Sequence, residues 1–505
     1  MKTRADRIAL VLSLLAVLAA YVVANRVFEN MAHIEDEMAY LWQAQAIAGG
    51  HLTVPSPPEP HSFLVPFVVD YNGQRFGKYP PGWPALLAIG IRLNLRNFVN
   101  PLLAGLGVWL TYRLAKKLMG ETVGVLAAVF TLASPFFLMN SASLLSHPMG
   151  LVLTLGFVIG YLDAFWNEDF PKPWLAVVTG AGCLGLLALS RPFTAVAVAA
   201  PFAIHALVVL VRGPAAVRWR MLAFGVIFAA LAALLFVWQF AVTGNPLLNP
   251  YTLWWPYDQV GFGPGHGRIP GGHNLDLAYI NTKFSFDLGK FDLFSGGVPF
   301  ALFIIPGIWV IRRNLRAILV ACLFPSLVLF YLAYWVGAWL YGPRYFYEGY
   351  ISIALLCAAG VAWLADWPTR AGEPWHTYEG WKRLRPLAVT GLTALLIGIN
   401  LTIYTPLRLG DMRGMYGVNR SALAPFETPQ AQELTPALVI VDVDDWINYG
   451  TLLELADPYL KTPFIFVISR SPEADNNVAA SFPERKLFYY YPEIDPYLFY
   501  TGPVF

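Results

Sequence analysis

The chain has 505 residues, of which 57% are hydrophobic and only 13% are charged, and its mean hydropathy is +0.52. This composition is too apolar for an ordinary soluble domain, and the length suits a helical bundle that crosses a membrane many times. The formal net charge is +2 with the basic residues dispersed, so nothing indicates nucleic-acid binding. Cys183, Cys322 and Cys357 all fall in apolar segments, which excludes a disulfide framework and a cysteine-based metal site.

About eleven apolar segments are candidate membrane helices, because a spanning helix needs about 20 mostly apolar residues. The first segment follows a basic N-terminus, and its length favours an uncleaved helix over a signal peptide. The expected spans are 8–27, 97–117, 122–140, 147–166, 174–190, 192–211, 221–243, 297–311, 317–338, 345–366 and 386–405.

Lysine and arginine accumulate in cytoplasmic loops, which orients these spans. With the N-terminus inside, the basic clusters fall in alternate loops, and the outer face receives two long loops at 28–96 and 244–296. We therefore expect a membrane module over 1–405. The outer tail at 406–505 predicts a small α/β domain, with strands at 437–443 and 463–468 and a helix at 449–459.

Three carboxylates, Glu35, Asp36 and Glu37, stand where the first apolar segment ends. An ionisable group held at membrane depth costs roughly 2.5–3.5 kcal/mol, so acids at such a position are functional candidates. The residues that follow predict a short interfacial helix over 37–48, stopped by Gly49-Gly50.

The second long outer loop is rich in aromatic residues and glycines, which suit an irregular segment whose backbone can approach a ligand closely. Trp255 and Tyr257 lie in its first part, and His266 and His273 flank a glycine-rich stretch. The two histidines lack helical metal-ligand spacing, so we expect a loop that covers a substrate rather than a metal pair.

The outer face also receives several cations and one more histidine. Lys78 lies in the first long loop, and His147, Arg191 and Arg344 lie in short outer turns. A carboxylate beside cations at a membrane surface suits group transfer from a lipid-phosphate donor. The carboxylate takes a proton from the acceptor while the cations neutralise charge that develops on the departing phosphate.

The order of these motifs resembles a known family. Asp36-Glu37-x-x-Tyr40 after the first helix, then Lys78-Tyr79-Pro80-Pro81, and the large bundle resemble the GT-C glycosyltransferases. Within this superfamily, the chain most resembles the group of protein O-mannosyltransferases and lipid A aminoarabinose transferases, which is similar to glycosyltransferase family 39. The resemblance covers about the first 400 residues.

The resemblance implies a GT-C fold and inverting transfer of a sugar from a polyprenyl-phosphate carrier, without an obligatory metal or other cofactor. It maps the catalytic base onto Asp36, its partner onto Glu37 and a donor-phosphate contact onto Lys78. An acid that the family often carries in the outer turn after the third helix is absent, and His147 stands there instead. The acceptor therefore stays open among a lipid, a glycan and a protein.

The resulting hypothesis is a polytopic α-helical enzyme of the membrane with a small extracytoplasmic α/β domain, placed in a bacterial inner membrane with its site on the periplasmic face. Lys78, Arg344 and Arg191 are expected at the donor phosphate. The expected substrate and acceptor pocket comprises Tyr40, Tyr79, His147, Trp255, Tyr257, His266, His273 and Tyr345.

Alternative interpretations exist at two levels. Asp36 could serve only as a helix cap, and Lys78 could be an interfacial lysine that snorkels. For the whole chain, a lipid-glycan flippase would favour internal repeats and charges at mid-membrane, which the sequence lacks. An oligosaccharide ligase would use a similar base and similar cations, and an assembly protein would act through the outer tail.

Overall fold

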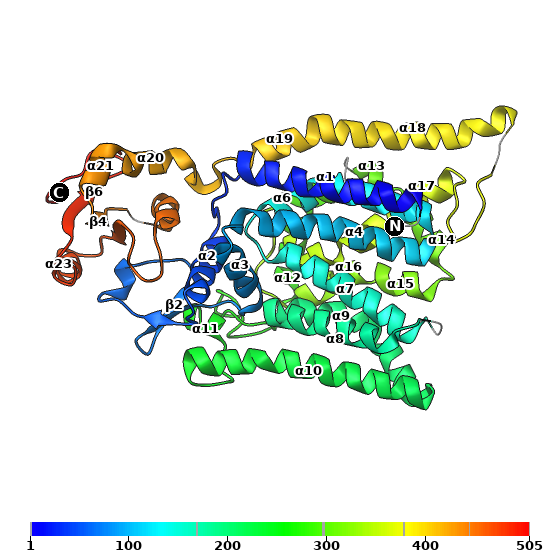
Figure 1. The fold of residues 1–505 in the computed structure, drawn as a ribbon, viewed down its shortest axis with the longest axis horizontal. Helices are drawn as coiled ribbons and strands as arrows, with labels where there is room; N and C mark the ends of the chain where they lie inside the picture. Colours follow the sequence, from blue (N-terminus) through cyan, green and yellow to red (C-terminus); the bar gives the residue numbers. More distant parts are fainter. Residues whose placement is uncertain (1–2, 168–169, 295–297, 377–378, 444, 504–505) are drawn as a thin grey trace.

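The computed structural model describes residues 3–503 apart from 168–169, 295–297, 377–378 and 444. Long helices lie side by side in a bundle, and the last part of the chain lies beyond one end of it (Figure 1). The longer bundle helices are α1 (Arg4–Arg26), α4 (Val99–Met119), α5 (Glu121–Leu132), α7 (His147–Phe165), α8 (Pro173–Ser190), α9 (Pro192–Arg212), α10 (Ala215–Thr243), α12 (Leu275–Leu293), α17 (Tyr350–Leu364) and α18 (Leu384–Ile399). The shorter ones are α6 (Pro135–Ala142), α13 (Val298–Ala301), α14 (Ile304–Ile311), α15 (Leu315–Ala321), α16 (Leu323–Tyr331) and α19 (Thr405–Gly410).

Among the described residues, seven helical segments are long and apolar enough to cross a membrane, or eight if the pair α5 and α6, bent by 62°, counts as one span. The polytopic helical class is thus confirmed, but the count of eleven spans is not. The segment expected at 97–117 is α4, which carries three cations near its end. Those expected at 297–311 and 317–338 form short, broken helices, and residue 297 lies outside the described part.

Small residues bring neighbouring helices close together, as is common where lipid replaces water as the solvent. A Cβ added to Gly160 of α7 would lie 2.7 Å from the Cα of Gly180 in α8. Helix α1 buries a stripe of small residues and exposes large ones such as Leu14 and Leu18. The apolar surface of α1 therefore faces outward, where acyl chains would contact it.

The loop expected over 244–296 is only partly a loop, because its last third forms the 19-residue helix α12. The side chain of Asn274 caps this helix by accepting from the Leu277 N–H. The charged residues of α12 hid it from a search for apolar runs. Its buried Asp292 accepts from Arg408 Nε at 3.0 Å and from the Tyr404 hydroxyl at 2.6 Å, which fastens α12 to the last bundle helices.

The end of the bundle that carries the C-terminal part also carries α2 (Glu35–Ala48), α3 (Gly82–Arg92) and α11 (Pro250–Trp254) (Figure 1). The helix expected over 37–48 is confirmed, with Gly49 as its C-cap. Next to it, β1 (Val54–Pro55), β2 (Val68–Tyr71) and β3 (Gln74–Gly77) form an antiparallel sheet in the order β1-β3-β2. Asn72 and Gly73 both have positive φ, as a tight two-residue hairpin requires, and the returning strand delivers Lys78.

The C-terminal part contains the parallel strands β4 (Ala437–Val441), β5 (Phe464–Ile468) and β6 (Lys486–Tyr490) in the order β5-β4-β6. The two expected strands are confirmed, whereas the helix expected at 449–459 is replaced by α22 (Trp446–Gly450) and the 3-10 helix η8 (Thr451–Leu455). The remaining helices there are α20 (Ala424–Glu427), α21 (Pro429–Glu433) and α23 (Pro472–Ala480). The Tyr459 hydroxyl donates to the Ala46 carbonyl at 2.8 Å, so this part contacts α2.

Replacing Asp292 with alanine should destabilise the protein, because Arg408 would then lose its buried partner. Breaking a buried ion pair costs about 3–5 kcal/mol. The measurement is the unfolding midpoint of the purified protein in detergent. Lys283→Ala removes an exposed ion pair from the same helix and should change the midpoint much less. Equal effects of the two substitutions would contradict this account of how α12 is held.

Candidate active site

The first turn of α2 places Asp36 at the centre of the site. Ile34, in extended backbone, precedes the helix, and the partial positive charge of a helix N-terminus favours acids there. Asp36 Oδ1 accepts from the Tyr79 hydroxyl at 2.6 Å, and Oδ2 lies 3.0 Å from Arg344 Nη2. The side chain of Asp36 stays 22% exposed. The carboxylate is thus held on both oxygens and is still reachable, and it does not act as the helix cap.

The surroundings keep this carboxyl ionised. Burial raises the pKa of Asp36, but the charge of Arg344 and the hydrogen bond from Tyr79 outweigh burial, so the pKa lies below its ordinary value. The neighbouring acid behaves in the opposite way. Burial, followed by the charge of Asp36, raises the pKa of Glu35. The two adjacent acids therefore differ, and Asp36 is the one that carries its charge most firmly.

Lys78 is surrounded by aromatic rings and one carboxylate. Its Nζ is 3.0 Å from Asp258 Oδ2 and 3.7 Å from the centre of the Phe67 ring. Both charged side chains are at most 3% exposed. Asp258 also accepts from the Tyr334 hydroxyl at 2.9 Å and from Trp335 Nε1 at 3.1 Å. Burial lowers the pKa of the Lys78 ammonium, and Asp258 opposes that shift without cancelling it.

Two cavities meet at the carboxylate of Asp36. The cavity that we call the basic cavity, of about 410 Å³, is lined by the three cations Lys78, Arg268 and Arg344 and by the acids Glu35, Asp36 and Asp258. The α9–α10 cavity, of about 250 Å³, is lined by Arg191 and by apolar residues of helices α9 and α10. The residues shared by both linings are Asp36, Tyr79, Asp258, Tyr334 and Tyr345. These five form a common wall, so one carboxylate can be approached from two sides.

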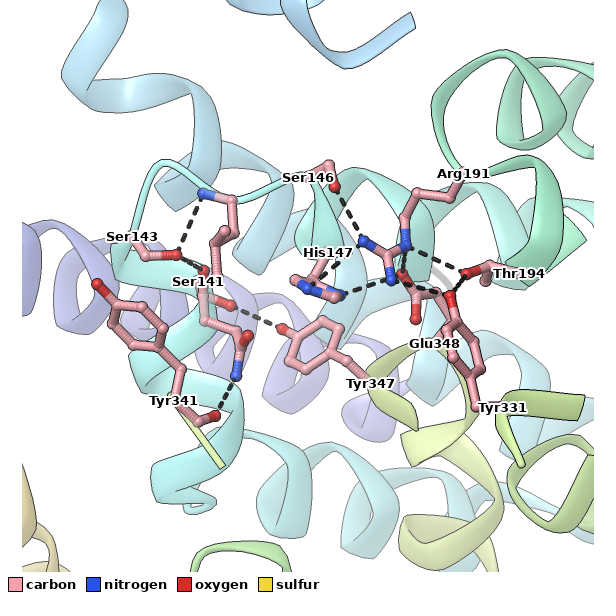
Figure 2. Close-up of polar contacts among 12 residues, drawn as sticks. Ser141, Ser143, Ser146, His147, Arg191, Thr194, Tyr331, Tyr341, Tyr347 and Glu348 are labelled. Atoms are coloured by element: carbon pink, nitrogen blue, oxygen red, sulfur yellow. Dashed lines mark hydrogen bonds and ion pairs between the residues drawn. The ribbon is translucent and has the colours of Figure 1, made fainter. Parts of the chain in front are cut away.

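The structure brings most of the expected site residues together. Tyr40 and Arg191 line the α9–α10 cavity. Trp255 lines the basic cavity, and the centre of its ring lies 4.9 Å from Lys78 Nζ. His147 is buried behind Arg191 and points toward Glu348 (Figure 2).

Besides His147, four expected residues line neither cavity. Glu37 is buried and accepts from the backbone N–H groups of His33 and Leu144 and from the Tyr341 hydroxyl, so it fastens α2 to its neighbours. Tyr257 stacks on Trp255. The other two are His266 and His273, which belong to the packing of the glycine-rich loop. Among the residues that the structure describes, no three His, Cys, Asp or Glu side chains gather as a metal site would require.

Sequence reasoning missed three residues of the site, although two left a signal. Asp258 directly follows the aromatic run of the second outer loop, and Glu348 is an acid inside an apolar segment. The rule that made Asp36 a candidate applies to both. Arg268, in the same glycine-rich stretch as the two histidines, stacks 5.2 Å from the centre of the Trp255 ring and left no signal beyond its charge.

No protein-family model matches the chain, and no curated protein gives a significant sequence match. Solved structures do match. The structure of ArnT from Cupriavidus metallidurans bound to undecaprenyl phosphate aligns with a TM-score of 0.57 and 14% sequence identity, over 94% of this chain and 88% of that one. The oligosaccharyltransferase AglB from Archaeoglobus fulgidus, in complex with an inhibitory peptide and a dolichol-phosphate, aligns with a TM-score of 0.52 and 13% identity, over 95% of this chain and 69% of that one.

The ion pair of Lys78 with Asp258 offers a test of the geometry. Lys78→Met and Asp258→Asn should each destabilise the protein, because each leaves a buried charge without its partner. The double variant should be more stable than the sum of the two effects implies, with a coupling of about 0.5–3 kcal/mol. Thermal unfolding of the four proteins in one detergent measures this quantity. Additive effects would mean that the two side chains do not interact.

Proposed function

We propose that this chain, which has the fold of the GT-C glycosyltransferases, transfers a sugar from a polyprenyl-phosphate carrier to an acceptor hydroxyl. The observation that carries the proposal is the meeting of two cavities at Asp36. A transfer between two substrates needs two binding places and one base within reach of both. The wall that the cavities share supplies that arrangement.

The basic cavity suits the phosphate of the donor. Lys78, Arg268 and Arg344 converge on it, and cations of this kind stabilise the charge that grows on a leaving phosphate. Within the described part of the chain, no ion pair engages Arg268, although Glu35 lines the same cavity, so an anion can bind Arg268 without breaking an ion pair. The similar ArnT structure is bound to undecaprenyl phosphate, a ligand of the class that this proposal assigns to the chain.

The proposed step is a single displacement. The acceptor hydroxyl lies in the α9–α10 cavity and gives its proton to Asp36 Oδ2 or Oδ1. The acceptor oxygen forms a bond to the anomeric carbon while the bond from that carbon to the phosphate oxygen breaks, and the electron pair stays on the phosphate. The two oxygens lie on opposite faces of the sugar, so the configuration inverts. Arg191 lines only the acceptor side, and we therefore no longer assign it to the phosphate.

Arg344 links the two halves of this reaction. It pairs with Asp36 and keeps the carboxylate a weak base. A donor phosphate in the basic cavity would share the guanidinium, weaken its hold on Asp36 and raise the pKa of that carboxyl. The base would thus strengthen when the donor binds. The proposal requires no metal or other cofactor and places the site on the periplasmic face of a bacterial inner membrane.

Asp36→Asn should lower the rate of sugar transfer by ~10²–10⁴, the usual contribution of a general base. The assay uses purified protein and synthetic polyprenyl-phosphate sugars. Binding of undecaprenyl phosphate should persist, because the cations of the basic cavity remain. Asp70→Asn changes an aspartate outside both cavities and should leave the rate unchanged. Full activity of Asp36→Asn would remove Asp36 as the base.

The pH dependence of kcat/KM for the donor should reflect Asp36 and Lys78 in the free enzyme. Asp36 must be ionised, and its pKa lies below the ordinary value of about 3.9 for Asp, so the rate should fall only below about pH 4. Lys78 must be charged, and its lowered pKa should bring the alkaline loss below about pH 10.4. A half-maximal rate near pH 6 to 7 on the acid side would contradict this assignment.

A further inference from the structure

Arg191 belongs to a buried charge cluster that the proposed transfer does not use. The cluster joins the turn between α8 and α9 to the start of α7 and to the 3-10 helix η3 (Arg344–Gly349) (Figure 2). Arg191 Nε lies 2.9 Å from Glu348 Oε1, and His147 Nδ1 lies 3.4 Å from the same oxygen. The side chain of Glu348 is fully buried. A buried carboxylate is costly unless it is paired, so Glu348 needs the pair with Arg191 to carry a charge there.

The contacts of His147 fit a single neutral tautomer. Its Nε2 lies 3.5 Å from Arg191 Nη1, an N–H donor, and its Nδ1 faces the carboxylate of Glu348. A ring that carries its proton on Nδ1 suits both contacts, although Nδ1 and the Glu348 oxygens make no well-directed hydrogen bond. With Glu348 ionised, the cluster holds one positive charge, one negative charge and one neutral ring, and its net charge is zero.

The backbone of α7 makes room for this cluster. A Cβ at Gly150 would lie 2.4 Å from Glu348 Oε1, so any larger residue there would displace the carboxylate. The position follows His147 by three residues on the same helix, and both therefore face η3. The absence of a side chain at Gly150 therefore leaves the space that the Glu348 carboxylate occupies.

The open side of the cluster presents hydroxyl groups to the α9–α10 cavity. Arg191 Nη1 donates to Ser146 Oγ at 3.2 Å, and that hydroxyl lies 3.3 Å from the Tyr40 hydroxyl. Arg191 Nη2 donates to the Tyr331 hydroxyl at 3.3 Å. Arg191, Tyr40 and Tyr331 all line the cavity. The polar lining of this cavity thus offers hydroxyl donors and acceptors, a guanidinium paired with Glu348, and the carboxylates of Asp36 and Asp258, and none of these is an unpaired cation.

The same cavity also has an apolar lining. It comprises Phe193 of α9, which packs on the Tyr331 ring, and Leu235 and Trp238 of α10. Aromatic rings and aliphatic chains pack well against the C–H faces of a sugar ring or against an alkyl chain. A ligand with a neutral hydroxylated head and an apolar tail matches the polar and the apolar parts of this lining.

We infer that the α9–α10 cavity binds the acceptor, and that this acceptor is a neutral sugar joined to an apolar chain. Arg191, Tyr40 and Tyr331 bind the sugar, and Glu348 balances the charge of Arg191. That this ligand is the acceptor of a transfer reaction rests on the proposed function. The chemistry of the site selects the ligand: a phosphorylated or carboxylated head would meet no free positive charge in this cavity, and its desolvation would go uncompensated.

Binding of two probes tests this selection without any transfer reaction. The probes are hexyl glucoside and its phosphate monoester, each competed against radiolabelled hexyl glucoside on purified full-length protein, so that binding of the phosphate in the basic cavity is not scored. The native protein should bind the neutral probe about tenfold more tightly than the charged one. Glu348→Gln leaves Arg191 unbalanced and should shift the ratio of the two affinities toward the phosphate by about tenfold or more. The double variant Arg191→Gln with Glu348→Gln should restore the preference for the neutral probe.

A matched control lies at the opposite end of α7. Asp163 pairs there with Lys117, 16 residues from His147 or about 24 Å along the helix. Asp163→Asn should not change the ratio of affinities. Thermal unfolding of each variant checks that it is folded, and the double variant keeps the test valid if Glu348→Gln is unstable, because it removes both charges together.

Three outcomes would overturn the inference: tighter binding of the charged probe by the native protein, an affinity ratio that Glu348→Gln leaves unchanged, and saturable binding of a serine-containing peptide that excludes hexyl glucoside. These results are independent of the proposed function. If transfer fails while the neutral probe binds as described, the cavity retains its ligand class and only the reaction is wrong. If transfer succeeds and the preference is absent, the reaction stands and the ligand class is wrong.

Discussion

The ion pair between Asp36 and Arg344 is the contact on which the rest of the site depends, because it joins the first outer helix to the residues that open α17, far along the chain. The separation is 308 residues. Asp36 belongs to the wall between the two cavities, Arg344 lines the basic cavity, and Tyr79 supports the pair from the side of the β2–β3 hairpin. Without the arginine, the carboxylate would stand half-buried beside Glu35 with like charge against it. Without the carboxylate, the arginine would be a cation with only 10% of its side chain exposed.

The same principle repeats around the site. Lys78 is balanced by Asp258, and Arg191 is balanced by Glu348, so three cations that would be expensive alone are each held by an acid from a distant part of the chain. Arg268 differs, because it rests on tryptophan rings and has no carboxylate partner in the described part of the chain. Acids thus balance the cations on both sides of the site, and Arg268, on the side that we assign to the donor, is near Glu35 without an ion pair in the described part of the chain.

Local signals in the sequence predicted a useful share of this structure. The apolar residues before Gly49-Gly50 predicted α2, and the order of Asp36 and Lys78 predicted that these two side chains would share one site, where they line one cavity. The pairings could not be predicted, because Lys78 and Asp258 lie 180 residues apart and nothing local couples them. Helix α12 was taken for a loop because its charged face breaks the apolar run on which membrane helices are recognised. Glu348 was overlooked because it sits inside an apolar segment, where the single acid was averaged away.

Stereochemistry gives the most direct test of the central claim, which is a single displacement at the anomeric carbon with Asp36 as the base. The measurement is the anomeric configuration of the product, determined by NMR after transfer from a polyprenyl-phosphate sugar of defined configuration. The account expects the inverted anomer, because acceptor and phosphate approach the sugar from the two cavities on opposite sides of Asp36. A product with retained configuration would contradict it, since retention requires a covalent intermediate or a different arrangement of the two substrates.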